Sequence, residues 1–143
     1  MTDVGLTHVA LTVTDMQRSL AFYAAYADLY EVHRRQDSAS GADVAWITDG
    51  TRPFVVVLIQ SNEVTARLSP LAHLGVGCRS RQEVIERCAR ATVDGISVDG
   101  PTDSGPPVGF WAFLRDPDGH TLELSYGQEI GLAVATPSNE QSK

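Results

Sequence analysis

One pattern of segments occurs twice in this chain, and this repeat constrains the fold more than any other feature. The segment 8–13 has the same character as the segment 73–78, 65 positions later, since each begins with a histidine and continues in small and apolar residues. A helix signal follows each segment, with Thr14 or Asp15 as the first N-cap and Ser80 as the second. Three strand-like segments follow each helix, separated by turn residues. The sequence therefore predicts an α+β fold of two βαβββ modules.

The spacing of apolar residues and turn signals sets the expected boundaries. The modules cover about residues 4–60 and 71–127, and together form one domain over 1–128, followed by a partly disordered tail at 129–143. We expect the two sheets to curve toward each other and form a mixed-sheet cleft. The expected strands after the two opening segments are 29–34, 44–48, 54–60, 96–99, 109–114 and 121–126.

Charge and hydropathy exclude several kinds of partner. The net charge is −7, so the chain lacks the clustered basic residues with which proteins bind nucleic acids or anionic membranes. The longest apolar run near the centre, 54–59, is too short to span a bilayer, and no hydrophobic signal segment opens the sequence. We expect a cytoplasmic protein whose partner is a small-molecule substrate.

Three residues that can bind a metal interrupt apolar, strand-like segments: His8, His73 and Glu123. A buried charge or unpaired imidazole is costly, so three such residues in core-like strands need partners. Side chains alternate between the faces of a strand, which predicts that all three point away from the helices and into one cleft. Two histidines and one carboxylate are the ligands of a 2-His-1-carboxylate metal site with open coordination positions.

The sequence resembles the vicinal oxygen chelate superfamily, which includes glyoxalase I, extradiol dioxygenases, fosfomycin-resistance transferases and bleomycin-resistance proteins. The resemblance covers about residues 4–128 and is carried by the segments 6–15, 19–23 and 113–124, in which Asp-Pro-Asp-Gly precedes Glu123 by four residues. It implies paired βαβββ modules around a cleft, with His8, His73 and Glu123 as metal ligands and Glu123 as the catalytic carboxylate.

The expected site departs from the family in one strand. A fourth ligand often comes from the last strand of the first module, where Val57 is the best match, and Gln60 could reach the metal only if the register slipped. The resemblance therefore implies three ligands with several positions open for substrate. Such a site favours Fe2+ or Mn2+, with Zn2+ or Ni2+ as possible alternatives, because a tetrahedral zinc leaves only one open position.

The substrate pocket is expected to be lined by Val55, Val57, Trp111, Phe113 and Arg115. No subfamily is matched in full. Phe113 stands where ring-cleaving dioxygenases have a tyrosine, and a small residue, Ala10, stands where fosfomycin transferases have a threonine.

The resemblance implies a glyoxalase-like lyase or a dioxygenase-like enzyme, acting as a homodimer, in which a divalent metal chelates two neighbouring substrate oxygens. The alternatives are a metal-free protein that sequesters small molecules, a thiol transferase, and a regulatory dimer with an inert cleft. In the simplest interpretation, Trp46 and Trp111 are core residues and His33 and His120 are solvated.

Overall fold

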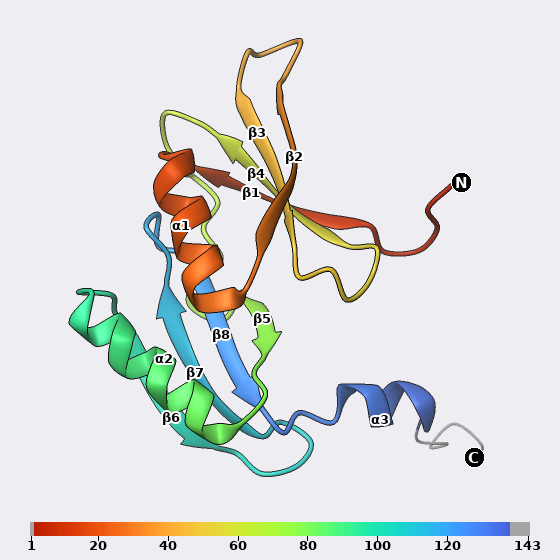
Figure 1. Ribbon diagram of the computed structural model, residues 1–143, viewed down its shortest axis with the longest axis vertical. Helices are drawn as coiled ribbons and strands as arrows, with labels where there is room; N and C mark the ends of the chain where they lie inside the picture. Colours follow the sequence, from red (N-terminus) through yellow and green to blue (C-terminus); the bar gives the residue numbers. More distant parts are fainter. Residues whose placement is uncertain (1, 138–143) are drawn as a thin grey trace. The chain divides into compact units, whose positions relative to one another are not determined.

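A computed structural model describes residues 2–137, and the chain divides into two compact units. The first unit contains the chain up to Ala72 together with the turn Asp116–His120, and the second contains His73–Arg115 and the chain from Thr121 onward. Each unit has one four-stranded mixed sheet and one long helix that covers one of its faces (Figure 1).

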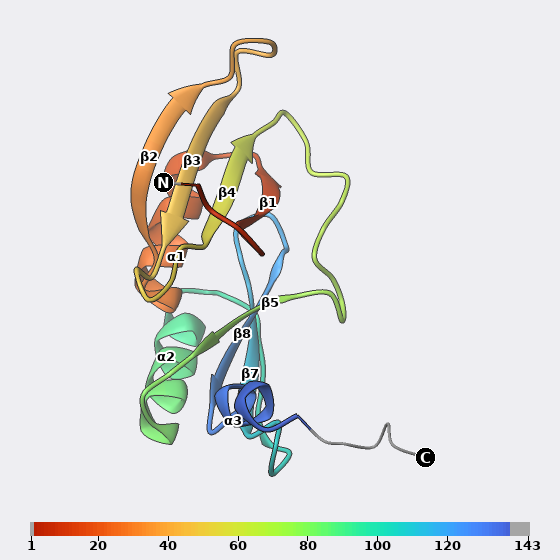
Figure 2. The same cartoon turned by 90° about the vertical axis from the view of Figure 1, so that its right-hand side faces the viewer.

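The sheet of the first unit has the strand order β1-β4-β3-β2. β1 (His8–Val13) pairs in parallel with β4 (Val55–Gln60), whereas β3 (Asp43–Thr48) is antiparallel to β4 and to β2 (Tyr30–Gln36). Parallel neighbours need a long connection, which here runs through α1 (Met16–Ala27), β2 and β3. Figure 2 shows the face of this sheet that α1 does not cover, with α1 behind it.

Local sequence signals explain where α1 begins and which face of β1 is covered. The Asp15 side chain accepts a hydrogen bond from the Arg18 N–H at 3.2 Å and caps the first turn. Asp28 ends the helix in the left-handed conformation, with φ of 54°. Leu11 and Val13 are buried, whereas the alternating residues of β1 are more accessible. One face of the sheet is therefore core, and the other carries the more exposed side chains.

The second unit repeats this topology, with the strand order β5-β8-β7-β6. β5 (Leu74–Gly77) pairs in parallel with β8 (Thr121–Tyr126), while β7 (Phe110–Arg115) is antiparallel to β8 and to β6 (Val98–Asp103). The connection after β5 contains α2 (Arg81–Val93). The predicted α+β fold of two βαβββ modules is confirmed.

The start and the core face of α2 also follow the sequence. The Ser80 hydroxyl accepts a hydrogen bond from the Glu83 N–H at 3.0 Å, as the capping pattern predicts. Val84 and Ala91 on this helix are fully buried, as is Leu122 of β8. The helix therefore covers the apolar face of the second sheet.

Several strand boundaries differ from the expected ones, most clearly in the second unit. β5 begins at Leu74, so His73 precedes the strand. β6 continues past Asp99, and its pairing with β7 is interrupted before Thr102. The intervening Gly100 and Pro101 look like a strand end in sequence, but a proline is tolerated at a bulge in an edge strand.

The range expected to be a tail contains a further element. The short helix α3 (Ile130–Ala135) has no buried residue. The rest of the predicted tail, 138–143, lies outside the described residues. None of the helices formed by residues 2–137 has the length and hydropathy of a membrane span.

Candidate functional site

Glu123 lies on the face of the second sheet that α2 does not cover, next to His73. Glu123 is 8% exposed as a whole residue. Its Oε2 atom lies 3.4 Å from Nε2 of His73, whose side chain is 34% exposed. Gly75 is the register partner of Glu123 on β5, and a Cβ atom built there would lie 3.3 Å from the same oxygen. The glycine thus leaves space beside the carboxylate that any other residue would reduce.

Aromatic side chains border this carboxylate–imidazole pair. Phe113 is the register partner of Glu123 on β7, and its ring centroid lies 5.1 Å from that of His73. Trp111, two residues earlier and therefore on the same face, lies 4.8 Å from Phe113. Arg115 continues this row and donates a hydrogen bond to the Thr121 hydroxyl. The second unit therefore brings five of the expected site residues together: His73, Trp111, Phe113, Arg115 and Glu123.

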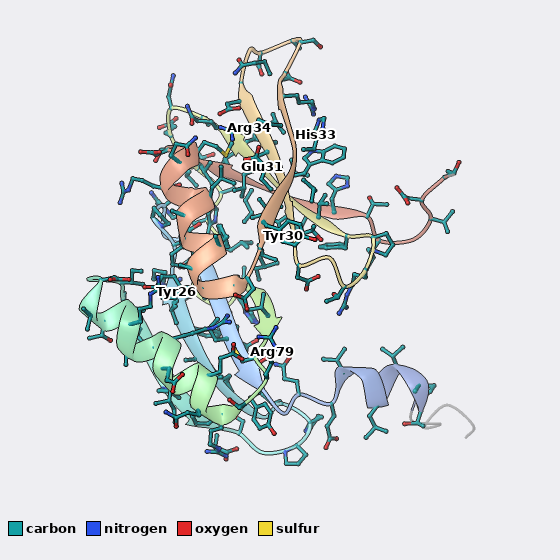
Figure 3. All side chains as sticks on the ribbon, in the orientation of Figure 1. Tyr26, Tyr30, Glu31, His33, Arg34 and Arg79 are labelled. Carbon is teal, nitrogen blue, oxygen red and sulfur yellow. The ribbon has the colours of Figure 1, made fainter. Side chains whose placement is uncertain are left out.

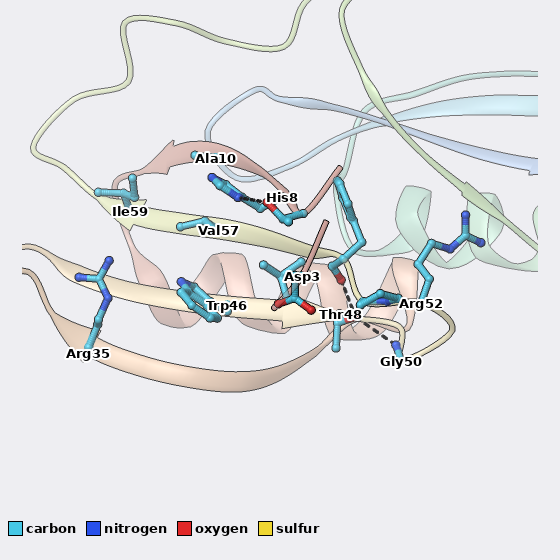
Figure 4. Close-up of a pocket in the computed structure, with 14 residues that line it drawn as sticks. Asp3, His8, Ala10, Arg35, Trp46, Thr48, Gly50, Arg52, Val57 and Ile59 are labelled. Atoms are coloured by element: carbon cyan, nitrogen blue, oxygen red, sulfur yellow. Dashed lines mark hydrogen bonds between the residues drawn. The ribbon is translucent and has the colours of Figure 1, made fainter. Parts of the chain in front are cut away.

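His8 belongs to the first unit, where it lines a hollow on the open face of the sheet (Figure 4). Nδ1 of His8 lies 2.9 Å from the Thr7 hydroxyl oxygen. When Nδ1 carries the proton and donates to Thr7, the Nε2 lone pair is available to a metal, and such an orienting partner is usual for histidine ligands. The expected pocket residues Val55 and Val57 line the same hollow.

The two imidazoles are less buried than the sequence suggested. His8 and His73 are both exposed residues, and only Glu123 of the expected ligand set is buried. The apolar segments that contain the histidines are the edge strand β1 and the approach to the edge strand β5. The premise that burial forces both histidines to have partners is therefore wrong, although it holds for Glu123.

Gln60 does not point into the hollow. Its Oε1 atom accepts a hydrogen bond from the Met16 N–H at 3.0 Å, at the start of α1. Val55, Val57 and Ile59 alternate with it and line the hollow instead. The register places Val57 opposite Ala10, so this part of the open face has no metal-binding side chain.

The fit to a divalent metal can be tested from the donor atoms. Two ligand atoms bound to one ion at about 2.0–2.2 Å lie roughly 3.0–3.5 Å from each other. The 3.4 Å between Nε2 of His73 and Oε2 of Glu123 agrees with this, and a carboxylate with an imidazole suits Fe2+, Mn2+ or Zn2+. Within residues 2–137, no group of three or more His, Cys, Asp or Glu side chains stands close enough to hold an ion, so this pair by itself is not a complete site.

The turn Asp116–His120 makes contacts that the sequence did not suggest. His120 was expected to be solvated, but it is fully buried. Its Nδ1 accepts a hydrogen bond from the Leu68 N–H at 3.0 Å, so its Nε2 donates to the Thr12 carbonyl oxygen at 2.8 Å. The expectation is wrong because the partners lie 52 and 108 positions away along the chain.

The same turn is joined to α1 through Tyr23. The Tyr23 hydroxyl donates to Oδ2 of Asp116 at 2.7 Å, and Oδ1 of Asp116 accepts from the backbone N–H groups of Asp118 and His120. Burial, reinforced by the negative charge of Asp116, raises the pKa of Tyr23 well above its ordinary value. This network is structural, and it fixes the turn that leads into the strand of Glu123.

Sequence reasoning also missed part of the hollow. Trp46, expected to be a core residue, is 37% exposed and lines it together with Arg35 and Arg52. The alternation of β3 was a usable signal, because Ala45 and Ile47 are buried on the opposite face. No local signal identifies Arg52, which lies between β3 and β4.

Comparison with known proteins points to one family. A family model described as the Glyoxalase/Bleomycin resistance protein/Dioxygenase superfamily matches residues 5–124. The uncharacterized protein PA2024 of Pseudomonas aeruginosa is 33% identical over 129 residues, which cover 88% of this chain and 91% of that protein.

Solved structures show the same fold at lower identity. Glyoxalase I of Leishmania major has a TM-score of 0.71 at 22% identity, and the match covers 93% of this chain and 94% of that one. A mutant of the fosfomycin resistance protein FosX of Listeria monocytogenes, complexed with Mn(II) and a dihydroxypropylphosphonic acid, has a TM-score of 0.70 at 19% identity, covering 93% and 99%. TnmS3, an antibiotic binding protein from Streptomyces sp. CB03234, has a TM-score of 0.63 at 21% identity, covering 88% and 98%.

Proposed function

Because this chain belongs to the glyoxalase/bleomycin resistance protein/dioxygenase superfamily, we propose that it is a metal-dependent enzyme acting on a small oxygenated substrate. The metal ligands are His8, His73 and Glu123. The observation that carries the proposal is the pair formed by His73 and the buried Glu123, whose facing atoms are 3.4 Å apart beside the space that Gly75 leaves. An isolated buried carboxylate is costly, and a cation shared with His73 offsets that cost.

The third ligand, His8, comes from the other unit of the same chain or of a second copy, and we propose a homodimer. Thr7 holds the His8 ring in a way that suits ligation through Nε2. The FosX relative, which was solved with Mn(II), supports a divalent ion of this kind. We favour Fe2+ or Mn2+ over Zn2+ or Ni2+, because three protein ligands leave an octahedral ion three open positions.

The bound ion supplies Lewis-acid stabilisation of negative charge on two neighbouring substrate oxygens, in a glyoxalase- or dioxygenase-like reaction. The chain's own residues orient the substrate and exclude water. Phe113 and Trp111 provide an apolar wall beside Glu123. Arg115, on the same row of β7, is placed to meet an anionic part of the substrate, and Glu123 is the proposed catalytic carboxylate.

Metal analysis of the untagged protein tests this proposal. We expect about one equivalent of a divalent metal per chain in the wild type, and its loss in His8→Ala, His73→Ala and Glu123→Ala. Two exposed residues provide matched controls, His33→Ala and Glu86→Ala, which should keep the metal. Retention of metal in all three ligand variants would refute the site. So would the absence of both copurified metal and any thermal shift on adding Mn2+, Fe2+, Ni2+ or Zn2+ to the wild type.

A second candidate function is metal-free sequestration of a small molecule, as the antibiotic-binding relative TnmS3 suggests. The half-exposed Trp46 beside the apolar Val57 favours it, since an apolar, concave surface binds flat ligands without a metal. Tight binding of an aromatic ligand to a protein that takes up no metal would favour sequestration over the enzyme.

A further inference from the structure

The hollow of the first unit has features that select a class of ligand. Its volume of about 720 Å³ is within the range of small-molecule sites. All the residues that line the hollow belong to the first unit, so the class of its ligand can be inferred without any residue of the second unit. It combines an apolar floor with charged ends.

A row of side chains across three strands forms the floor. Ala10 on β1 is the register partner of Val57 on β4, and Val57 is the partner of Trp46 on β3. Side-chain size increases along this row from the methyl group of Ala10 through Val57 to the indole of Trp46, which leaves a depression beside the indole. Figure 4 shows His8 and Ala10 on one side of this depression and Trp46 on the other.

The Trp46 ring is held in place from outside the hollow. His33, the register partner of Trp46 on β2, has its ring centroid 4.6 Å from that of the indole. His33 and Arg34 leave β2 on opposite sides, so His33 lies on the open face, away from α1 (Figure 3). A braced, 37% exposed tryptophan on the floor of a hollow is suited to stacking against a flat ring.

Arg52 supplies a positive charge that is not neutralised by an ion pair. Within residues 2–137, its hydrogen bond goes from Nε to the Thr51 hydroxyl at 3.3 Å, and no carboxylate lies within ion-pair distance. The carboxylate of Asp49 accepts hydrogen bonds from Thr51, which are the main reason that the pKa of Asp49 is lowered. The positive charge of Arg52 lowers that pKa further, from beyond ion-pair distance. Arg34, by contrast, pairs with both Glu31 and Asp43.

The other charges of the hollow leave Arg52 as the best anion site. Arg35 lies on the far side of Trp46 from Arg52 and has an ion pair with Asp37 at 3.5 Å. Asp3 is the one acidic residue in the lining, against two arginines. Because Arg35 is paired with Asp37, Arg52 is the arginine of the lining that is left to bind an anionic group.

We propose that this hollow binds a planar anion, an aromatic or conjugated ring that stacks on Trp46 and carries a carboxylate that Arg52 binds. The planar guanidinium is suited to a carboxylate, because its N–H groups form paired hydrogen bonds with the two oxygens. A planar anion of this kind would be the substrate class of the proposed enzyme, and its role as a substrate rests on that proposed function. The binding itself requires no metal.

Titration of EDTA-treated protein with 2-naphthoate and its neutral analogue 2-naphthamide tests the proposal. The chain has two tryptophans, Trp46 and Trp111, so two indole N–H signals in a 1H–15N spectrum report binding, assigned with Trp46→Phe. We expect 2-naphthoate to shift the Trp46 signal and to bind at least 10-fold more tightly than 2-naphthamide. Arg52→Gln should remove this preference, whereas Arg18→Gln, an exposed position on α1, should keep it.

Equal affinity for the two probes in the wild type would overturn the proposal, as would a preference for 2-naphthoate that survives in Arg52→Gln or a Trp46 signal that does not respond. Because both substituted residues are on the surface, the dispersion of the spectrum shows whether each variant is folded. Binding to EDTA-treated protein does not depend on His8, His73 and Glu123 holding a metal. Failure of the metal analysis and failure of this titration are therefore separate results.

Discussion

Replacing His120 with alanine should lower the free energy of unfolding by about 4 kcal/mol, because the ring is fully buried and both its nitrogens are hydrogen-bonded. The loss of ring contacts and the cavity left behind account for about 2 kcal/mol. The Leu68 N–H and the Thr12 carbonyl oxygen each lose a partner in a partly buried place, at about 1 kcal/mol each.

Two further variants separate the hydrogen bonds from the general effect of losing a histidine. In His120→Asn, the side-chain oxygen can still accept from the Leu68 N–H, so we expect a loss of about 2 kcal/mol. In His33→Ala, an exposed ring that packs against Trp46 is removed, and the expected loss is less than about 1 kcal/mol.

Urea denaturation at neutral pH, followed by circular dichroism, gives the midpoint and slope for each variant. The order of stability should be wild type, His33→Ala, His120→Asn and His120→Ala, with similar slopes. The reasoning fails if His120→Ala lies within about 1 kcal/mol of the wild type, or if His33→Ala costs as much as His120→Ala.

Three further substitutions test the packing. Tyr23→Phe leaves a buried Asp116 oxygen without its hydrogen-bond donor and should lower the free energy of unfolding by about 2 kcal/mol. Because folding raises the pKa of Tyr23, the tyrosine of the unfolded wild type loses its proton first, and wild-type stability should fall as the pH rises above about 10. Urea melts at about pH 9 and pH 11 should show this fall in the wild type and not in Tyr23→Phe. Gly109→Ala places a Cβ atom 2.5 Å from a backbone oxygen at φ of +87° and should cost about 3 kcal/mol in a thermal melt, against about 1 kcal/mol for Gly41→Ala, where the space is open. Ser19→Ala should stabilise the protein by about 1 kcal/mol in the same melt, because the buried Ser19 hydroxyl has no partner among the described residues; a destabilised variant would contradict this.

The candidate site was predictable from the sequence where strand alternation applies. Glu123 and Phe113 lie on adjacent strands in register, and Trp111 and Arg115 follow by alternation on β7. The burial of the histidines was not predictable in this way. An apolar segment indicates a strand, but not whether that strand lies at the edge of a sheet or whether a second layer covers its other face.

The contacts of His120 illustrate the same limit. In sequence, the residue ends a turn of Asp, Pro and Gly, where polar side chains are usually solvated. In the structure, its two partners come from β1 and from the linker after β4. Only folding brings these segments together, so no local pattern carries the information.

The sequence by itself determined the two βαβββ modules, the caps of both long helices and the strand faces of His8 and Glu123, because these depend on periodicities of two and 3.6 residues and on interactions within one turn. Tertiary structure decided which of those faces stay open, which polar groups are buried, and that Trp46 stands exposed in a hollow with Arg52. These properties depend on which strands become edges and on contacts between residues tens of positions apart, which no local period encodes.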